Sequence, residues 1–150
     1  MELQKAIDQD LELLVTIAYR AKCHWDYPQD FLDKCRVYFK EEFTPEYLEK
    51  SHTCLIKQDD TVIGMGTLLW EDEPMLDQFW FLPEYIGKGL GRKAFELFVV
   101  EAKKRDWPSL TIISDVYAEG FYKTMGAKRV GELKSAVRDA MLPKMLLTLK

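Results

Sequence analysis

The turn that decides the fold reads Leu82-Pro83-Glu84-Tyr85-Ile86-Gly87-Lys88-Gly89-Leu90-Gly91-Arg92. Glycine occupies every second position in its second half, so backbone N–H groups there can face a ligand without obstruction by a Cβ atom. A helix that begins at Leu90 adds the partial positive charge of its amino end. The turn therefore predicts a site for a diphosphate, to which Lys88 and Arg92 add charge. An ordinary strand-to-helix turn is the alternative that the glycine spacing leaves open.

The segments on both sides of this turn place it between a strand and a helix. Residues 75–82 are rich in aromatic side chains and lie between two prolines, which predicts a mostly buried central strand. Beyond the turn, apolar residues recur with helical spacing and predict an amphipathic helix of about four turns that ends at Trp107-Pro108. These apolar positions are Leu90, Ala94, Leu97, Phe98 and Ala102.

The remaining segments predict a mixed α/β fold. Strands are expected at residues 3–6, 53–57, 61–70, 110–114, 127–133 and 144–149. Helices are expected after Asp8 or Asp10, around residues 31–39, from Thr44, and over residues 118–125 before the C-cap Gly126. This order predicts a mixed sheet covered by helices, with right-handed crossovers where a helix joins two strands.

Composition bounds the kind of protein. The 150 residues are 47% hydrophobic and 31% charged, which predicts a single domain spanning residues 1–150. The 21 basic and 25 acidic residues leave a net charge of −4, which disfavours nucleic-acid binding and favours a cationic small molecule. No apolar run approaches the roughly 20 residues of a membrane helix. Cys23, Cys35 and Cys54 show no pairing pattern, so a reducing, cytoplasmic location is expected.

The turn also carries a resemblance to a known family. Neither Gly-x-Gly-x-x-Gly nor Gly-x-x-x-x-Gly-Lys-Ser/Thr occurs, so the common nucleotide-binding motifs are excluded. The six residues from Ile86 to Gly91 resemble the acetyl-CoA loop of the GNAT superfamily of N-acetyltransferases, Arg/Gln-x-x-Gly-x-Gly/Ala. Ile86 replaces the usual Arg or Gln, which is expected to weaken one side-chain contact.

Two later segments extend the resemblance. Residues 118–127 resemble the closing helix of the family, Ala-x-x-Phe-Tyr-x-x-x-Gly-Phe, and Asp115 stands where many members carry Asn. Residues 135–145, with Arg138 and Leu142-Pro143-x-Met145, resemble the tail of a bacterial subgroup of small members. The resemblance implies a mostly antiparallel sheet in which two parallel strands, here residues 75–82 and 110–114, splay apart in a V.

Acetyl-CoA is the co-substrate that the resemblance implies. The backbone of Phe81 is expected to bond its pantetheine arm, and the amides from Lys88 to Arg92 are expected to hold its diphosphate. A strand N–H near Phe79 to Phe81 is expected to stabilise the oxyanion of the tetrahedral intermediate. The expected cofactor-binding residues are Phe81, Ile86, Gly87, Lys88, Gly89, Leu90, Gly91, Arg92 and Asp115.

The resemblance gives Tyr122 the role of protonating the departing CoA thiolate. A phenol of pKa near 10 is a weaker acid than a thiol near 8.5, so this transfer is uphill by about 2 kcal/mol unless the site shifts one pKa. A core aromatic residue beside Phe121 is the alternative. Loss of Tyr122 is therefore expected to slow turnover without abolishing it.

The acceptor amine needs a base. An alkylamine of pKa near 10.4 is only about 0.04% neutral at pH 7, which costs about 4.6 kcal/mol. Asp77 on the predicted central strand is the catalytic candidate, with Glu71 or Glu73 just before it as others. A solvated loop carboxylate is the alternative for each, and it is preferred for Glu73.

Other polar and aromatic residues give weaker indications. His24 and His52 fall in no motif of the family, so a surface or core role is preferred for both. With two histidines and no Cys-x-x-Cys, no metal site is expected. Trp25, Tyr27 and Tyr38 line an acceptor pocket in one interpretation and belong to the core in the other.

The leading interpretation is an acetyl-CoA-dependent N-acetyltransferase in which the primary amine of a small molecule attacks the thioester directly. A catalytically silent acyl-CoA-binding or sensing module is one alternative, because Ile86 and Asp115 depart from the family pattern. A protein or peptide acetyltransferase is another. Small relatives often dimerise through their last strands, so the resemblance also implies a homodimer.

Overall fold

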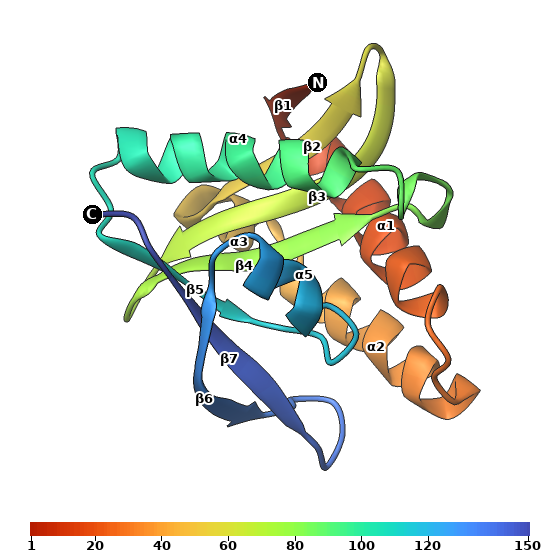
Figure 1. Cartoon of the computed structure of the whole chain (residues 1–150). Coiled ribbons are helices and arrows are strands. Elements are labelled where there is room, and N and C mark those ends of the chain that lie inside the picture. The colour runs from red at the N-terminus through yellow and green to blue at the C-terminus, as the bar shows by residue number, and fades with distance from the viewer.

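A seven-stranded mixed sheet forms the centre of the computed structural model, which describes residues 1–150 (Figure 1). The strands lie in the order β1-β2-β3-β4-β5-β7-β6, and all neighbours are antiparallel except β4 and β5. Their bounds are Glu2–Lys5 (β1), His52–Gln58 (β2), Thr61–Trp70 (β3), Pro74–Phe81 (β4), Ser109–Ile113 (β5), Lys128–Lys134 (β6) and Met141–Thr148 (β7).

Helices cover both faces of this sheet. The α-helices are Leu11–Cys23 (α1), Gln29–Glu42 (α2), Pro45–Lys50 (α3), Leu90–Lys104 (α4) and Glu119–Thr124 (α5). The short 3-10 helices Asp8–Asp10 (η1) and Pro83–Tyr85 (η2) precede α1 and α4. Two buried clusters form the core: α4 and α5 close one, around Phe98 and Leu110, and α1 to α3 close the other, around Leu14 and Ile17. The sheet therefore has a hydrophobic layer on each face.

The parallel pair β4 and β5 is joined at a single position, Met75 opposite Thr111. Beyond it the strands diverge, and α5 lies over the gap between them (Figure 1). Backbone groups of β4 on that side, from about Phe79 to Phe81, therefore have no strand partner. The predicted V-shaped splay is confirmed, and it exposes free strand backbone in the middle of the sheet.

A bulge in β4 changes which side chains face each layer. Thr67 pairs with Gln78 and Leu68 pairs with Leu76, so Asp77 is an extra residue on β4. A bulge re-aims side chains locally. As a result Asp77, Gln78 and Trp80 all lie on the side of β4 that α2 covers.

The predicted elements are confirmed with small shifts of their ends. The last strand is Met141–Thr148, so the predicted start at residue 144 was three residues late. Pairing of β5 with β7 begins at Lys144, and at Pro143 the strand only accepts a hydrogen bond, from Ser114 N–H. Proline is tolerated there because no donor is needed on that side. The two 3-10 helices were not predicted.

Two further features concern membrane helices and the cysteines. No helix combines the length and the apolar character needed to cross a bilayer. The three cysteines are free thiols, with Cys35 and Cys54 buried and Cys23 exposed.

Candidate active site

The glycine turn between β4 and α4 has the backbone geometry expected for an anion site. Gly87 and Gly89 adopt φ angles of +79° and +77°, which L side chains rarely adopt, and a Cβ atom added at either would meet open space. Gly89 is the N-cap of α4, no side chain caps this end, and no acidic residue lies in the first turn. The first N–H groups of a 15-residue helix are therefore free for an anion.

A cavity of about 420 Å³ opens between this turn, β4 and α5; we call it the splay cavity. Its walls are mainly apolar, and the turn contributes Gly87, Gly89, Gly91 and Arg92 to them. The remaining lining residues are Ala21, Trp25, Phe79, Trp80, Phe81, Tyr85, Ile86, Asp115, Tyr117, Ala118, Phe121, Tyr122, Thr124 and Met125. Of the nine predicted cofactor-binding residues, only Lys88 and Leu90 do not line it.

Tyr122 is buried beneath the splay cavity, and its hydroxyl forms no hydrogen bond with another residue. Burial raises the pKa of this phenol, and the negative charge of Asp115 raises it further. Aromatic rings surround it, with Phe79, Phe95 and Phe121 at centroid distances of 6.5, 6.1 and 5.3 Å. Tyr122 is therefore both a core residue and a protonated donor without a protein partner.

A second cavity of about 290 Å³ lies on the other side of Trp80; we call it the α2-side cavity. Asp77, Gln78 and Trp80 of β4 line it together with four residues of α2, namely Phe31, Cys35, Tyr38 and Phe39. Its far wall includes the segment Leu133–Arg138. Trp80 and Asp115 line both cavities, so the two spaces meet at these residues.

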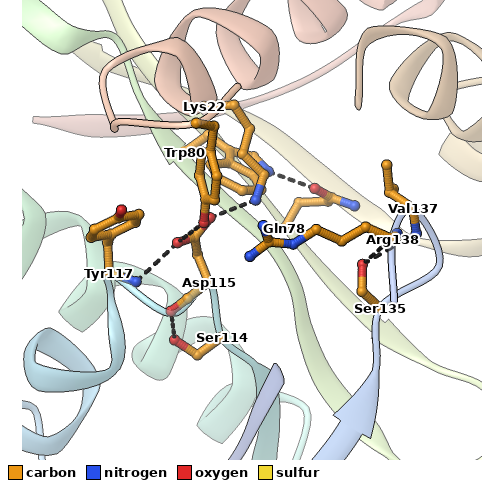
Figure 2. Close-up of polar contacts among 10 residues, drawn as sticks. Lys22, Gln78, Trp80, Ser114, Asp115, Tyr117, Ser135, Val137 and Arg138 are labelled. Atoms are coloured by element: carbon orange, nitrogen blue, oxygen red, sulfur yellow. Dashed lines mark hydrogen bonds and ion pairs between the residues drawn. The ribbon is translucent and has the colours of Figure 1, made fainter. Parts of the chain in front are cut away.

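Asp115 is held at this junction by three donors (Figure 2). Lys22 Nζ lies 2.5 Å from one carboxylate oxygen, and the Tyr27 hydroxyl and the Tyr117 N–H each donate to the other at 2.9 Å. The side chains of Asp115 and Lys22 are only 5% and 12% exposed. Burial raises the pKa of Tyr27, and the neighbouring Asp115 charge raises it further, so Tyr27 remains a donor. Asp115 is therefore a fixed, paired carboxylate.

Asp77 lies in the α2-side cavity and accepts a hydrogen bond of 2.5 Å from the Tyr47 hydroxyl. Burial raises the pKa of Asp77, although the Tyr47 hydrogen bond acts in the opposite direction. Tyr47 owes its place to α3, whose N-cap Thr44 accepts from the Tyr47 N–H. The side chain of Asp77 is thus held in place and is a stronger base than an ordinary aspartate.

Comparison with known proteins identifies the family. The sequence model described as the acetyltransferase (GNAT) family matches residues 18–127, more than half of the chain. The chain belongs to the GNAT acetyltransferase family. It is accordingly an N-acetyltransferase, and the glycine turn, β4 and α5 all lie within the matched region. No curated protein sequence gives a significant match.

Solved GNAT structures share the fold along the whole chain. A GCN5-related N-acetyltransferase from Rhodopseudomonas palustris has 14% identity and a TM-score of 0.82, with 99% of this chain and 95% of that chain covered. The PaiA N-acetyltransferase from Thermoplasma acidophilum, solved with coenzyme A, has 19% identity, a TM-score of 0.76 and 98% coverage of both chains. The ribosomal-protein-S18-alanine N-acetyltransferase from Escherichia coli has 18% identity, a TM-score of 0.72 and coverage of 99% and 94%.

The other catalytic candidates of this GNAT protein lie away from the cavity junction. Glu71 and Glu73 pair with Lys50 and Lys144 at 3.3 and 3.5 Å, and their side chains are 59% and 41% exposed. His52 contacts Cys54 Sγ at 3.2 Å on β2, and His24 packs on Trp25; neither lines either of the two cavities. No three His, Cys, Asp or Glu side chains gather in an arrangement suited to a metal ion.

The three aromatic residues considered for the acceptor pocket lie in two different cavities. Tyr27 and Tyr38 line the α2-side cavity, whereas Trp25 lines the splay cavity and stacks on Tyr117 at 5.0 Å. Sequence reasoning missed Trp80 as the shared wall and Lys22 as the partner of Asp115. Lys22 and Asp115 are 93 residues apart, and no local pattern connects them.

Proposed function

We propose that this GNAT protein transfers the acetyl group of acetyl-CoA to the primary amine of a small molecule. One observation carries the proposal: the splay cavity and the α2-side cavity meet at Trp80 and Asp115. The first borders the glycine turn, and the second contains Asp77. A thioester in the first and an amine in the second would meet at this junction.

The residues of the splay cavity fit acetyl-CoA. The positive φ angles of Gly87 and Gly89 and the uncapped start of α4 suit a diphosphate, and Arg92 adds a cation. The unpaired backbone of β4 near Phe81 suits the amide groups of pantetheine, as an added strand would. Ile86 lines the cavity and packs against the core, so its apolar side chain is accommodated.

Acetyl-CoA supplies an acyl thioester that an amine can attack directly. Asp77 acts on the acceptor: its carboxylate accepts a proton from the ammonium group that enters the α2-side cavity. Because burial raises the pKa of Asp77, less free energy is needed to move that proton than with an ordinary aspartate. Tyr47 orients the carboxylate through its hydroxyl.

Tyr122 acts on the departing sulfur. Its free hydroxyl lines the splay cavity, and its raised pKa keeps it protonated throughout the physiological pH range. The same raised pKa makes complete proton transfer to a thiolate less favourable than the approximate 2 kcal/mol obtained from reference values. Tyr122 therefore stabilises the thiolate mainly as a hydrogen-bond donor.

The size of the α2-side cavity supports a small acceptor over a protein. It encloses about 290 Å³ between α2, β4 and the segment Leu133–Arg138. This volume accommodates a molecule of amino-acid size and leaves little room for an extended peptide.

Thiol release from acetyl-CoA tests the function. The acceptor panel contains polyamines, amino acids, aminoglycosides and peptides, and wild type is compared with Tyr122→Phe. Release with a small amine, reduced in the variant, supports the proposal. Release with peptides alone would favour a protein acetyltransferase, and tight acetyl-CoA binding without any release would favour the silent binding module.

A further inference from the structure

The turn between β6 and β7 places one side chain, Arg138, in the α2-side cavity. Ser135 Oγ accepts the N–H groups of Val137 and Arg138 at 3.2 and 3.4 Å, and the Ser135 N–H donates to the Ala140 carbonyl at 2.8 Å. These bonds fix the backbone from which Arg138 extends towards Lys22 and Asp115 (Figure 2). The mechanism above gives Arg138 no role, although it lines the cavity.

Aromatic rings hold the guanidinium group of Arg138. Its Cζ atom lies 4.7 Å from the ring centroid of Phe31 and 5.3 Å from that of Tyr27. Lys22 Nζ lies against the same two rings, at 5.5 and 5.0 Å. Two cations therefore share one aromatic surface. Ring faces attract cations but carry no net charge, so they do not neutralise either of them.

The carboxylates near these cations already have other partners. Asp115 is bound by Lys22 at 2.5 Å, and no carboxylate forms an ion pair with Arg138. Asp77 accepts from Tyr47, and the nearby Lys134 has Asp139 as its partner at 3.5 Å. Arg138 is solvent-exposed, and its guanidinium is a cation positioned by aromatic rings at the edge of the cavity, with a fork of N–H donors that lacks an anion.

We propose that Arg138 binds a carboxylate of the acceptor, which makes the acceptor an amino acid; this inference rests on the proposed function. Guanidinium and carboxylate form paired N–H···O bonds that fix orientation as well as charge. Asp77 lines the same cavity and receives the ammonium group, so both charges of the zwitterion meet an opposite charge. An amino-acid acceptor differs from the cationic acceptor expected from the net charge of −4, because the local charge of the cavity differs from the overall charge.

Matched acceptor pairs test this inference. Each pair contains an amino acid and the amine that lacks only its carboxylate: leucine and isopentylamine, tyrosine and tyramine, lysine and cadaverine. We expect wild type to acetylate at least one amino acid with kcat/KM about tenfold or more above its partner amine, a preference of about 1.4 kcal/mol or more. In Arg138→Gln, KM for that amino acid rises about tenfold or more, kcat changes little, and KM for the partner amine is unchanged.

Two further variants separate binding from structural effects. Arg138→Lys keeps the charge without the fork and is expected to restore part of the affinity. Arg129→Gln removes an exposed arginine of β6 that pairs with Glu119 and Glu132, and it is expected to leave both acceptors unaffected. Equal losses with amino acid and partner amine in Arg138→Gln would overturn the inference, because they would indicate a structural role.

The outcomes for the inference and for the proposed function differ. Better turnover of the amines without a carboxylate would overturn the inference and leave the acetyltransferase function intact. Absence of turnover with every amine tested would count against the proposed function. Calorimetry with the N-acetyl derivatives of the three amino acids, in the presence of CoA, then decides the inference independently. Binding that is tenfold weaker in Arg138→Gln supports it, and binding no tighter than that of the neutral N-acetylamines overturns it.

Discussion

Asp77→Asn tests the proposed role of Asp77, which lines the α2-side cavity, as the general base. Asparagine has nearly the same shape and still accepts the Tyr47 hydroxyl, so the packing around β4 is preserved. It cannot accept the proton of an ammonium group at neutral pH. Removal of a positioned general base typically costs 10² to 10⁴ in rate, so we expect kcat/KM at pH 7 to fall about 100-fold or more.

The pH dependence gives this prediction a second readout. An alkylamine of pKa near 10.4 is about 0.04% neutral at pH 7 and about 4% neutral at pH 9, roughly a 100-fold increase. The variant depends on amine that is already neutral, so its deficit relative to wild type is expected to shrink strongly between pH 7 and pH 9. The wild-type rate at low pH falls as Asp77 is protonated, at a pH above its ordinary pKa of 3.8.

Asp77→Asn is expected to lower activity but not the free energy of unfolding. Because burial raises the pKa of Asp77, the native state retains a proton that the unfolded chain releases above pH 3.8. Stability contributed by this group is therefore present at low pH and is lost as pH rises through the raised pKa. Asp77→Asn escapes that loss, so urea denaturation at pH 7 should find it at least as stable as wild type.

The assay is thiol release with the best amine of the panel, measured from pH 5 to pH 9. Glu73→Gln is the matched control, since it removes a half-exposed carboxylate that lies outside the α2-side cavity and should change kcat/KM by less than about twofold. An Asp77→Asn enzyme within threefold of wild type, with the same pH profile, would refute the assignment of Asp77 as the base.

Three other variants test the cofactor turn, the leaving group and the junction. Gly89→Ala places a side chain at φ +77°, so thermal unfolding should reveal a loss of about 1–2 kcal/mol in stability, together with weaker acetyl-CoA binding. Gly120→Ala in α5, which has open space around it, should be neutral or stabilising, and equal stability of the two variants would contradict strain at position 89. Tyr122→Phe should lower kcat several-fold with little change in acetyl-CoA affinity, as stopped-flow thiol release and calorimetry can measure; an unchanged kcat would remove its role. Lys22→Met leaves the buried Asp115 charge unpaired and should cost about 3 kcal/mol in urea denaturation, and a loss below about 1 kcal/mol would contradict the pairing.

Local sequence patterns predicted the fold because each element carries its own periodicity and its own boundary residues. The alternating glycines predicted a turn whose backbone no Cβ atom obstructs, and Gly87 and Gly89 adopt positive φ angles there. Thr44 followed by Pro45 predicted a helix start, and the Thr44 side chain caps α3. The splay of β4 and β5 came from the resemblance alone, because nothing in either strand indicates where their pairing stops.

The remainder of the site depends on contacts between distant segments. The bulge that makes Asp77 an extra residue of β4 is a property of the pairing between β3 and β4, so the sequence of β4 alone does not predict it. The bond from Tyr47 to Asp77 spans 30 residues, and that from Lys22 to Asp115 spans 93. Arg138 belongs to the tail motif of the sequence, but its place in the α2-side cavity depends on the fold of the turn between β6 and β7.

In the proposed function, the splay cavity and the α2-side cavity form one continuous site for both substrates. A bisubstrate compound tests it most directly: CoA joined through an acetyl bridge to the nitrogen of the best acceptor, titrated against wild type by calorimetry beside CoA alone. If the cavities meet at Trp80 and Asp115, the compound should bind about 100-fold or more tightly than CoA, because both parts bind without a second loss of translational freedom. Affinity equal to that of CoA would show that the two cavities do not bind the two substrates as one site.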